Sequence, residues 1–296
     1  MTARTGSLPF LPFVGSHAAR IMGGLPDDLY RDANTLAMSL LGTCDLYDLD
    51  GLSVGYDLAA TVPEQPPPPA AWPTDCPFTL DDPSGQHLSP ATRFHTIRDA
   101  AAHLSNGPGN LLLQVAVPGP LTLTQTRADG AAQPHTPVAS ILQTIAAFAD
   151  DIQILTLVDP RLTERTPYAE DELSSAYARI SSLARHYGML TALYPGRPGD
   201  PGALDEFTTW SDILVVDGES VSPTDLPPDA PMVAVGIRPS TFDRTHKDLK
   251  DLAARLHDSW TDHPAYLTTL GALAYDCPPE TVREFVTLQR QQTDSG

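Results

Sequence analysis

Residues 111–120 read LLLQVAVPGP, a nearly continuous apolar run that ends at a Pro-Gly-Pro turn. A strand with apolar side chains on both faces indicates burial on both sides, as in a parallel sheet covered by helices. Other short runs of similar composition recur along the chain. The eight predicted strands are Leu8–Val14, Leu52–Tyr56, Leu111–Val117, Gln153–Val158, Met189–Tyr194, Ile213–Val216, Met232–Gly236 and Ala265–Leu270.

Segments with apolar residues at helical spacing separate most of these runs. Glu170–Tyr187 carries Leu173, Tyr177 and Ile180 on one face and ends before Gly188, which is typical of a helix stop. The other predicted helices are Asp27–Leu41, Pro90–Leu104, Pro137–Ala149, Thr245–Trp260 and Pro278–Gln291, with shorter ones at Ala203–Thr209 and Ser222–Leu226. This α/β alternation predicts a single (β/α)8 TIM-type barrel, with a doubly wound open sheet as the alternative.

One domain over residues 1–296 is expected, because such barrels routinely form single domains of roughly 250 residues. Residues 64–82 interrupt the alternation after the second strand, and they contain four consecutive prolines at Pro66–Pro69. Such a segment is extended and semi-rigid. It is either a surface linker or a lid over the end of the barrel. Residues 291–296 are expected to be a flexible tail.

The chain is strongly acidic, with a formal net charge of -19. This charge argues against nucleic acid and anionic membranes as partners, because both require clustered cations. Its 3 cysteines are widely spaced, which does not fit a disulfide framework. The sequence shows neither a signal peptide nor a membrane-spanning apolar segment. We therefore expect a cytoplasmic protein that acts on a small molecule.

Active sites of these barrels form at the carboxyl ends of the strands. The residues expected there are a mixture of acids, arginines and tyrosines, which could hold a polar small molecule by charge-assisted hydrogen bonds. The alternative is that they only cap strands and helices. The candidate site residues are His17, Arg20, Tyr56, Asp57, Gln114, Asp159, Tyr194, Asp217, Arg238, Tyr275 and Cys277.

Sequence motifs for several common sites are absent. The chain contains neither the phosphate-binding G-x-x-x-x-G-K-[ST] nor the dinucleotide-binding G-x-G-x-x-G element. It also lacks H-E-x-x-H, C-x-x-C and the G-x-S-x-G nucleophile elbow. We therefore expect no cofactor and no metal from local motifs.

Four stretches, residues 11–41, 44–64, 111–126 and 266–286, together resemble the uroporphyrinogen decarboxylase superfamily. This group includes corrinoid-linked thiol methyltransferases and is similar in fold to cobalamin-independent methionine synthase. The resemblance implies a barrel. It also implies that Asp57 matches an aspartate that contacts the substrate's pyrrole nitrogens in the decarboxylases. Arg20 matches the second of two carboxylate-binding arginines, and Ser16 stands where the first would be. That departure implies a smaller and less anionic substrate than uroporphyrinogen.

In the methyltransferases of this group, zinc is held by a His-x-Cys pair after the fifth strand and by a cysteine near the eighth. Leu193 and Pro195 stand where the pair would be, and Cys277 matches the remaining cysteine. Leucine and proline cannot ligate a metal, and zinc needs three or four protein ligands. The resemblance therefore implies that the zinc site is lost.

Three functions remain open. The first is a metal-independent enzyme of the decarboxylase or lyase type, in which Asp57 transfers a proton or stabilises a cation and Tyr56 and Tyr194 act with it as catalytic residues. In this scheme the other candidates bind substrate, with Arg20 and Arg238 anchoring a carboxylate. The second is a methyltransferase with a corrinoid protein as partner. The third is a barrel that only binds or scaffolds. The resembled family also suggests a homodimer.

Overall fold

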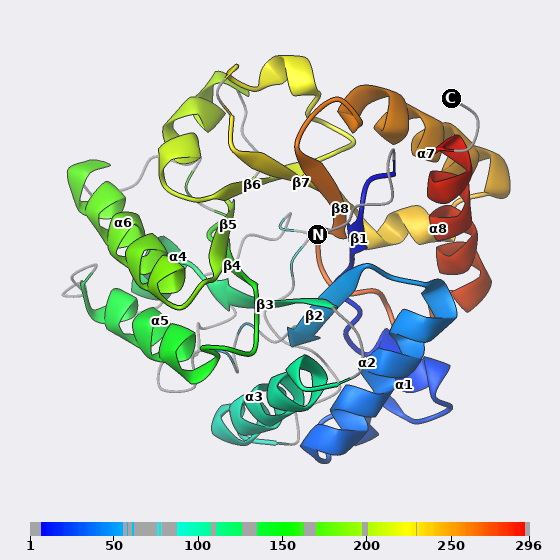
Figure 1. Cartoon of the computed structure of the whole chain (residues 1–296), viewed down its shortest axis with the longest axis horizontal. Helices are drawn as coiled ribbons and strands as arrows, with labels where there is room; N and C mark the ends of the chain where they lie inside the picture. Colours follow the sequence, from blue (N-terminus) through cyan, green and yellow to red (C-terminus); the bar gives the residue numbers. More distant parts are fainter. Residues whose placement is uncertain are drawn as a thin grey trace.

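The computed structural model describes residues 7–55, 58, 61, 76, 78, 88–107, 111–125, 135–160, 162, 170–196, 201–228 and 230–293. Eight parallel strands lie at the centre and helices surround them (Figure 1). All eight strands predicted from the apolar runs are present. Their bounds are β1 Phe10–Leu11, β2 Gly51–Gly55, β3 Leu112–Pro118, β4 Ile154–Val158, β5 Leu190–Tyr194, β6 Ile213–Asp217, β7 Met232–Ile237 and β8 Ala265–Thr269.

The strands follow the order of a closed barrel. Their hydrogen-bonded order is β1-β8-β7-β6-β5-β4-β3-β2, so the first and last strands in the chain are neighbours. The gap between β1 and β2 is bridged by a hydrogen bond of 3.2 Å from the Ser53 amide to the Pro12 carbonyl. The predicted (β/α)8 barrel is therefore confirmed, and the open doubly wound sheet is wrong.

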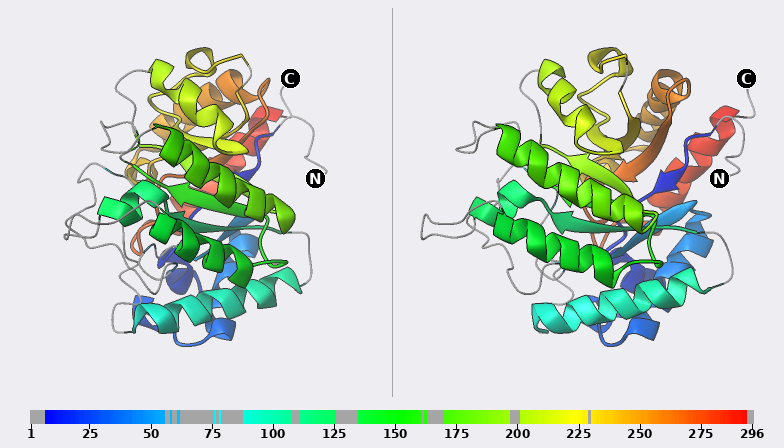
Figure 2. Two further views of the ribbon diagram at one scale, coloured as in Figure 1. Left: turned by 90° about the vertical axis from the view of Figure 1, so that its left-hand side faces the viewer. Right: turned by 60° about the vertical axis from the view of Figure 1, so that its left-hand side comes forward.

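The outer layer consists of helices in the connections between strands. Figure 2 shows α3, α5 and α6 stacked side by side along the outside of the strands. The helices are α1 His17–Ile21, α2 Ala33–Tyr47, α3 Pro90–Ser105, α4 Pro120–Gln125, α5 His135–Ala147, α6 Glu170–His186, α7 His246–Trp260 and α8 Pro279–Thr293. Short 3-10 helices η1 Pro26–Asp28, η4 Pro201–Thr209, η5 Pro223–Asp225 and η6 Pro239–Asp243 complete the layer among the described residues.

One predicted helix, Asp27–Leu41, has the wrong start and end. The chain first forms η1, and α2 begins after Asp32, whose carboxylate accepts a hydrogen bond of 2.9 Å from the Thr35 amide. An aspartate at this position satisfies an amide that would otherwise lack a partner, so it marks the true helix start. Two short helices, α1 and α4, were not predicted. The two short predicted helices between β5, β6 and β7 are 3-10 helices.

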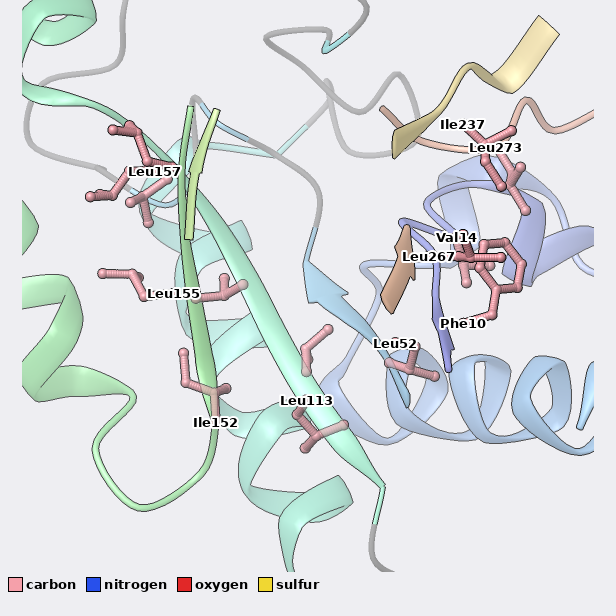
Figure 3. Close-up of a cluster of buried hydrophobic side chains, with 14 of the residues drawn as sticks. Phe10, Val14, Leu52, Leu113, Ile152, Leu155, Leu157, Ile237, Leu267 and Leu273 are labelled. Atoms are coloured by element: carbon pink, nitrogen blue, oxygen red, sulfur yellow. The ribbon is translucent and has the colours of Figure 1, made fainter. Parts of the chain in front are cut away.

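Alternating side chains of the strands divide the core in two. The larger, outer cluster lies between strands and helices, and Figure 3 shows Phe10, Leu52, Leu113, Leu155 and Leu267 among its members. The smaller, inner cluster fills the barrel and includes members of the odd-numbered and even-numbered strands. This division follows from the two-residue period of a strand, in which successive side chains point to opposite faces.

Most of the proline-rich segment 64–82 lies outside the described residues, which include only Cys76 and Phe78 from it. Of the predicted tail 291–296, residues 291–293 form the end of α8, so the prediction is wrong for them, and residues 294–296 lie outside the described residues. Within the described part of the chain, no helix combines the length and apolar character needed to cross a membrane.

Candidate functional site

Three predicted site residues lie at the carboxyl ends of the adjacent strands β5, β6 and β7, and we call this end of the barrel the mouth. Tyr194 belongs to the inner cluster, whereas Leu193 belongs to the outer one. On β6, Val215 is in the inner cluster, so Asp217 two residues later lies on the same side. Arg238 follows β7 directly and reaches Asp217.

An ion pair joins Asp217 to Arg238. Both Nε and Nη2 of Arg238 donate to Asp217 Oδ2, at 3.1 Å and 2.6 Å. Asp217 also accepts hydrogen bonds from the Glu219 amide and the Ser220 hydroxyl, both at 3.0 Å. The hydrogen bonds to Asp217 raise the pKa of Arg238 above its usual value. Because the Arg238 side chain is still 37% exposed, its fixed guanidinium can also contact a solute.

A second acid–base pair supports this part of the mouth. Glu219 accepts a hydrogen bond of 2.8 Å from Thr241 and one of 2.7 Å from Arg244. Burial raises the pKa of Glu219, but the hydrogen bonds from Arg244 and Thr241 outweigh it and the pKa is lowered. Glu219 therefore stays ionised, and the loop after β6 is tied to the segment after β7.

Three aromatic rings meet across the mouth. Phe13, just after β1, lies edge-on to Phe78, with ring centroids 5.4 Å apart. Phe78 in turn lies against Tyr194, with centroids 5.0 Å apart and the rings tilted by 50°. The three rings belong to the inner cluster together with Leu58. The floor of the candidate site is therefore apolar, and its charged groups lie on one side.

Asp159 follows β4 but is fully buried. Its carboxylate accepts hydrogen bonds from the amides of Leu121 and Thr122 at 2.8 and 2.7 Å, and from the hydroxyls of Thr122 and Tyr177 at 2.6 and 2.5 Å. Burial raises its pKa, and these four donors offset part of that effect. A Cβ atom on Gly119 would come within 2.4 Å of Asp159, so glycine is required there. The structure thus places Asp159 at the start of α4, with protein donors on both oxygens.

Another group of predicted residues lies between α1 and the segment after β8. Nε2 of the fully buried His17 lies 2.7 Å from the Tyr47 hydroxyl. Burial lowers the pKa of His17 to about 4, so this histidine is neutral at pH 7. Its Nδ1 has no hydrogen-bond partner among the described residues. Arg20 donates to the Tyr275 carbonyl at 3.3 Å, and the Tyr275 hydroxyl donates to the Gly24 carbonyl at 3.1 Å. These contacts join the chain after β1 to the chain after β8.

Cys277 belongs to the same group. Its side chain is buried, and burial raises the pKa of its thiol to about 12. A thiol with this pKa is almost entirely protonated at pH 7, whereas the thiolate is the nucleophile and the metal ligand. In this conformation Cys277 is therefore a packed side chain rather than an activated thiol.

Gln114 lies inside the barrel. Its amide nitrogen donates to the Leu11 carbonyl at 2.9 Å, and its amide oxygen lies 3.5 Å from the Thr156 hydroxyl. The Thr268 hydroxyl donates to the same Leu11 carbonyl at 2.8 Å. Gln114 thus connects strands through the interior. The two remaining candidates, Tyr56 and Asp57, lie outside the described residues, so their assignment stays a prediction.

The described residues do not fit a zinc site of the kind found in the resembled methyltransferases. Leu193 points outward into the outer cluster, and the inward positions on this strand carry Ala192 and Tyr194. No three His, Cys, Asp or Glu side chains in the described part of the chain are arranged to hold a metal. The loss of the zinc site stays a prediction.

Sequence reasoning did not identify Phe13, Phe78 or Tyr47 as part of the candidate site. Phe13 could have been found, because it lies two residues after Leu11 and shares its inward face. The contact between Phe78 and the mouth leaves no periodic signal, since it joins residues that are far apart in the chain. The same is true of the pairing of His17 with Tyr47.

Comparison with known proteins adds to this geometry at the level of fold. No protein-family model matches the chain, and no curated protein matches its sequence. A methyltransferase from Methanosarcina mazei has a similar structure, with a TM-score of 0.71 and 14% identity over 97% of this chain and 94% of that one.

A B12-independent methionine synthase from Shewanella sp. W3-18-1, in complex with selenomethionine, has a TM-score of 0.55 and 13% identity. That match covers 98% of this chain and 97% of the synthase. The protein GH5_18 from Bifidobacterium longum subsp. longum also reaches 0.55, at 14% identity, over 96% of this chain and 79% of that one. The resemblance expected from the sequence is confirmed for the barrel fold. At these identities, fold alone does not determine function.

Proposed function

We propose that this protein is an enzyme of the methyltransferase type that binds a small carboxylated substrate at the mouth of the barrel. The observation that carries the proposal is the ion pair between Asp217 and Arg238, which holds a partly exposed guanidinium at the carboxyl ends of β6 and β7. Methyl transfer is favoured over decarboxylation because two structures similar over nearly the whole chain are a methyltransferase and a methionine synthase.

Arg238 is suited to bind the substrate carboxylate. Asp217 holds the guanidinium through Nε and Nη2, so little side-chain freedom is lost when a ligand binds. A hydrogen bond to a charged group contributes about 1.5–3 kcal/mol. A local cation is also necessary, because a chain with a net charge of -19 repels anions at long range.

The apolar floor suits the transfer step itself. Transfer of a methyl group requires the acceptor atom and the methyl carbon to be held in line, and positioning of this kind supplies much of the rate acceleration. Phe13, Val158 and Tyr194 exclude water from one side of such a pair. The predicted loss of the zinc site at Leu193 and Pro195 would leave activation of the substrate's nucleophile to a protein base. With a methylcorrinoid as the second substrate, its methyl–cobalt bond would break as the bond from the methyl carbon to the acceptor forms, and the reduced corrinoid would leave. Asp57, which the resemblance matches to a substrate-contacting aspartate, is proposed to accept the proton of the acceptor.

The test is transfer of a labelled methyl group. The protein is incubated with methylcobalamin carrying a 13C-methyl group and a panel of small carboxylated thiols, and products are followed by NMR. Arg238→Gln should raise KM about 10-fold to 100-fold, the loss of one charged hydrogen bond. Arg98→Gln is the matched control, because Arg98 is 39% exposed and pairs with Asp99 on the outside of α3. Absence of methylated product, or an unchanged KM in Arg238→Gln, would contradict the proposal.

A barrel that binds without catalysis is the second candidate. One observation favours it, since the Phe78 ring already occupies the mouth. Ligand binding that depends on Arg238 without any methylated product would support this candidate. Release of carbon dioxide from the same carboxylates would instead support the metal-independent decarboxylase.

A further inference from the structure

The side chain of Phe78 lies on the barrel axis. It contacts Phe13 after β1 and Tyr194 on β5, and these two strands are four apart in an eight-stranded barrel, so they face each other across it. Phe78 is fully buried. Its ring comes from the connection between β2 and α3 rather than from a strand, so it enters the barrel from the mouth.

The barrel leaves room for this ring. Ala116, Ala192 and Ala234 belong to the inner cluster on β3, β5 and β7, where larger residues commonly fill barrels of this type. Small side chains at these positions leave space along the axis. Phe78 and Leu58, both from the connection after β2, fill the upper part of that space. Apolar side chains from the connection after β2 thus occupy space that the small strand residues leave open.

The polar groups of the mouth lie beside the ring. Tyr194 contacts Phe78 directly and ends β5, which pairs with β6, and Asp217 at the end of β6 holds Arg238. A ligand in the place of Phe78 would therefore have aromatic walls on two sides and a guanidinium near its edge. Aromatic rings prefer edge-on and offset contacts, which Phe13 and Tyr194 already offer.

We propose that the place of the Phe78 ring is a binding subsite for the aromatic ring of a substrate that also carries a carboxylate. The inference rests on the proposed function for the location of the site. A substrate ring would replace the contacts that Phe78 loses, so the exchange of one ring for the other costs little contact energy. Arg238 would bind the carboxylate of this substrate at the rim of the barrel. The Phe78 side chain has no charged group and cannot make this contact.

Two probes, benzoate and toluene, separate this subsite from an ordinary cavity. An apolar cavity left by removal of a core ring binds a neutral aromatic molecule. It does not accept a carboxylate, because an unpaired charge is costly to bury. Phe148→Ala is therefore the control, since Phe148 is also fully buried but lies in the outer cluster against Phe94.

Affinities are measured by calorimetry on the full chain. Phe78→Ala should bind benzoate at least 10-fold more tightly than the wild-type protein. Phe148→Ala should gain affinity for toluene only. Adding Arg238→Gln to Phe78→Ala should return benzoate binding to the wild-type value and leave toluene binding unchanged. The proposal would be overturned if Phe78→Ala and Phe148→Ala gained equal affinity for benzoate. It would also be overturned if the gain in Phe78→Ala persisted after Arg238→Gln was added.

The wild-type protein gives an independent readout if Phe78→Ala does not fold. Cys76 is partly buried two residues before Phe78. If benzoate takes the place of the ring, saturating benzoate should speed the reaction of Cys76 with a thiol reagent several-fold, and toluene less so. An unchanged rate would count against the subsite. If benzoate binds as described but no methyl transfer is found, the subsite is supported and the proposed function is rejected. If methyl transfer is found but the alanine variants show no such gains in benzoate affinity, the proposed function is supported and the subsite is rejected.

Discussion

The hydroxyl of Tyr177 on α6 donates a hydrogen bond of 2.5 Å to Oδ2 of Asp159, the residue that follows β4. Both side chains are fully buried. Burial, together with the nearby carboxylate, raises the pKa of Tyr177 well above its usual range, so the phenol remains the donor. Since Asp159 also accepts from the first turn of α4, one acid joins a strand end to two helices.

Replacement of Asp159 should destabilise the protein strongly. Asp159→Asn places an NH2 group where protein donors already point, and buried groups left unsatisfied cost about 1–3 kcal/mol each. We expect a loss of about 3 kcal/mol or more in the free energy of unfolding, measured in urea. Tyr177→Phe should cost about 1–2 kcal/mol, because it removes one donor. Asp99→Asn on exposed α3 is the control and should change stability by less than about 0.5 kcal/mol.

The tight approach of Gly119 to the same carboxylate gives a second prediction. A methyl group at this position would lie 2.4 Å from Asp159 Oδ2, so Gly119→Ala must displace a buried acid or the backbone. Overpacking of this kind costs about 1–3 kcal/mol. Gly24→Ala is the control, because its nearest contact would be 3.5 Å. Equal thermal stability of the two variants would contradict the close approach of Gly119 to the Asp159 carboxylate.

Stability should fall as the pH falls from 7 to 5, and His17 should account for a large part of the loss. Its pKa is about 4 in the folded protein, against about 6.5 for an exposed histidine. The unfolded state therefore takes up the proton first, and the loss spans the window between these two values. We expect about 2 kcal/mol from this group between pH 7 and pH 5. In His17→Gln the pH dependence should be correspondingly weaker, whereas His103→Gln on exposed α3 should retain it.

The three thiols should differ in reactivity. Cys44 and Cys277 are buried with pKa values raised to about 12 by burial, whereas Cys76 is partly exposed. A thiol reagent at pH 8 should therefore modify one cysteine per native chain, and the Cys76→Ser variant should lose that reaction. All three should react after unfolding. Rapid modification of Cys277 in the native protein would indicate an activated thiol and contradict its description as a packed side chain.

Much of the barrel could be predicted from the sequence because each strand carries its own signal. The run around Val115 is apolar on both faces, and burial on both faces is what a parallel barrel requires. Helix ends were less predictable, because they depend on single capping groups such as Asp32, which the apolar period does not reveal. Whether a segment forms a strand or a helix is thus decided by many residues, whereas the residue at which a helix begins is decided by a single capping group.

The candidate site could be predicted only in part. Active sites of these barrels form at the carboxyl ends of the strands, and this correctly predicted that Tyr194, Asp217 and Arg238 lie at one end of the barrel. The prediction holds because neighbouring parallel strands end together. The rule could not distinguish Asp159 from them, because its role depends on donors from α4 and α6. Contacts of this kind join distant segments, and no local pattern encodes them.

The alternation of β5 has a consequence for redesign. Leu193 faces the helices, so a histidine engineered there would point away from the substrate space and into packed hydrocarbon. On this strand, ligands for a new metal would have to replace Ala192 and Tyr194, which face the barrel axis. The second of these replacements would remove a ring that contacts Phe78. A metal ligand at position 194 and the aromatic contact with Phe78 therefore exclude each other on β5.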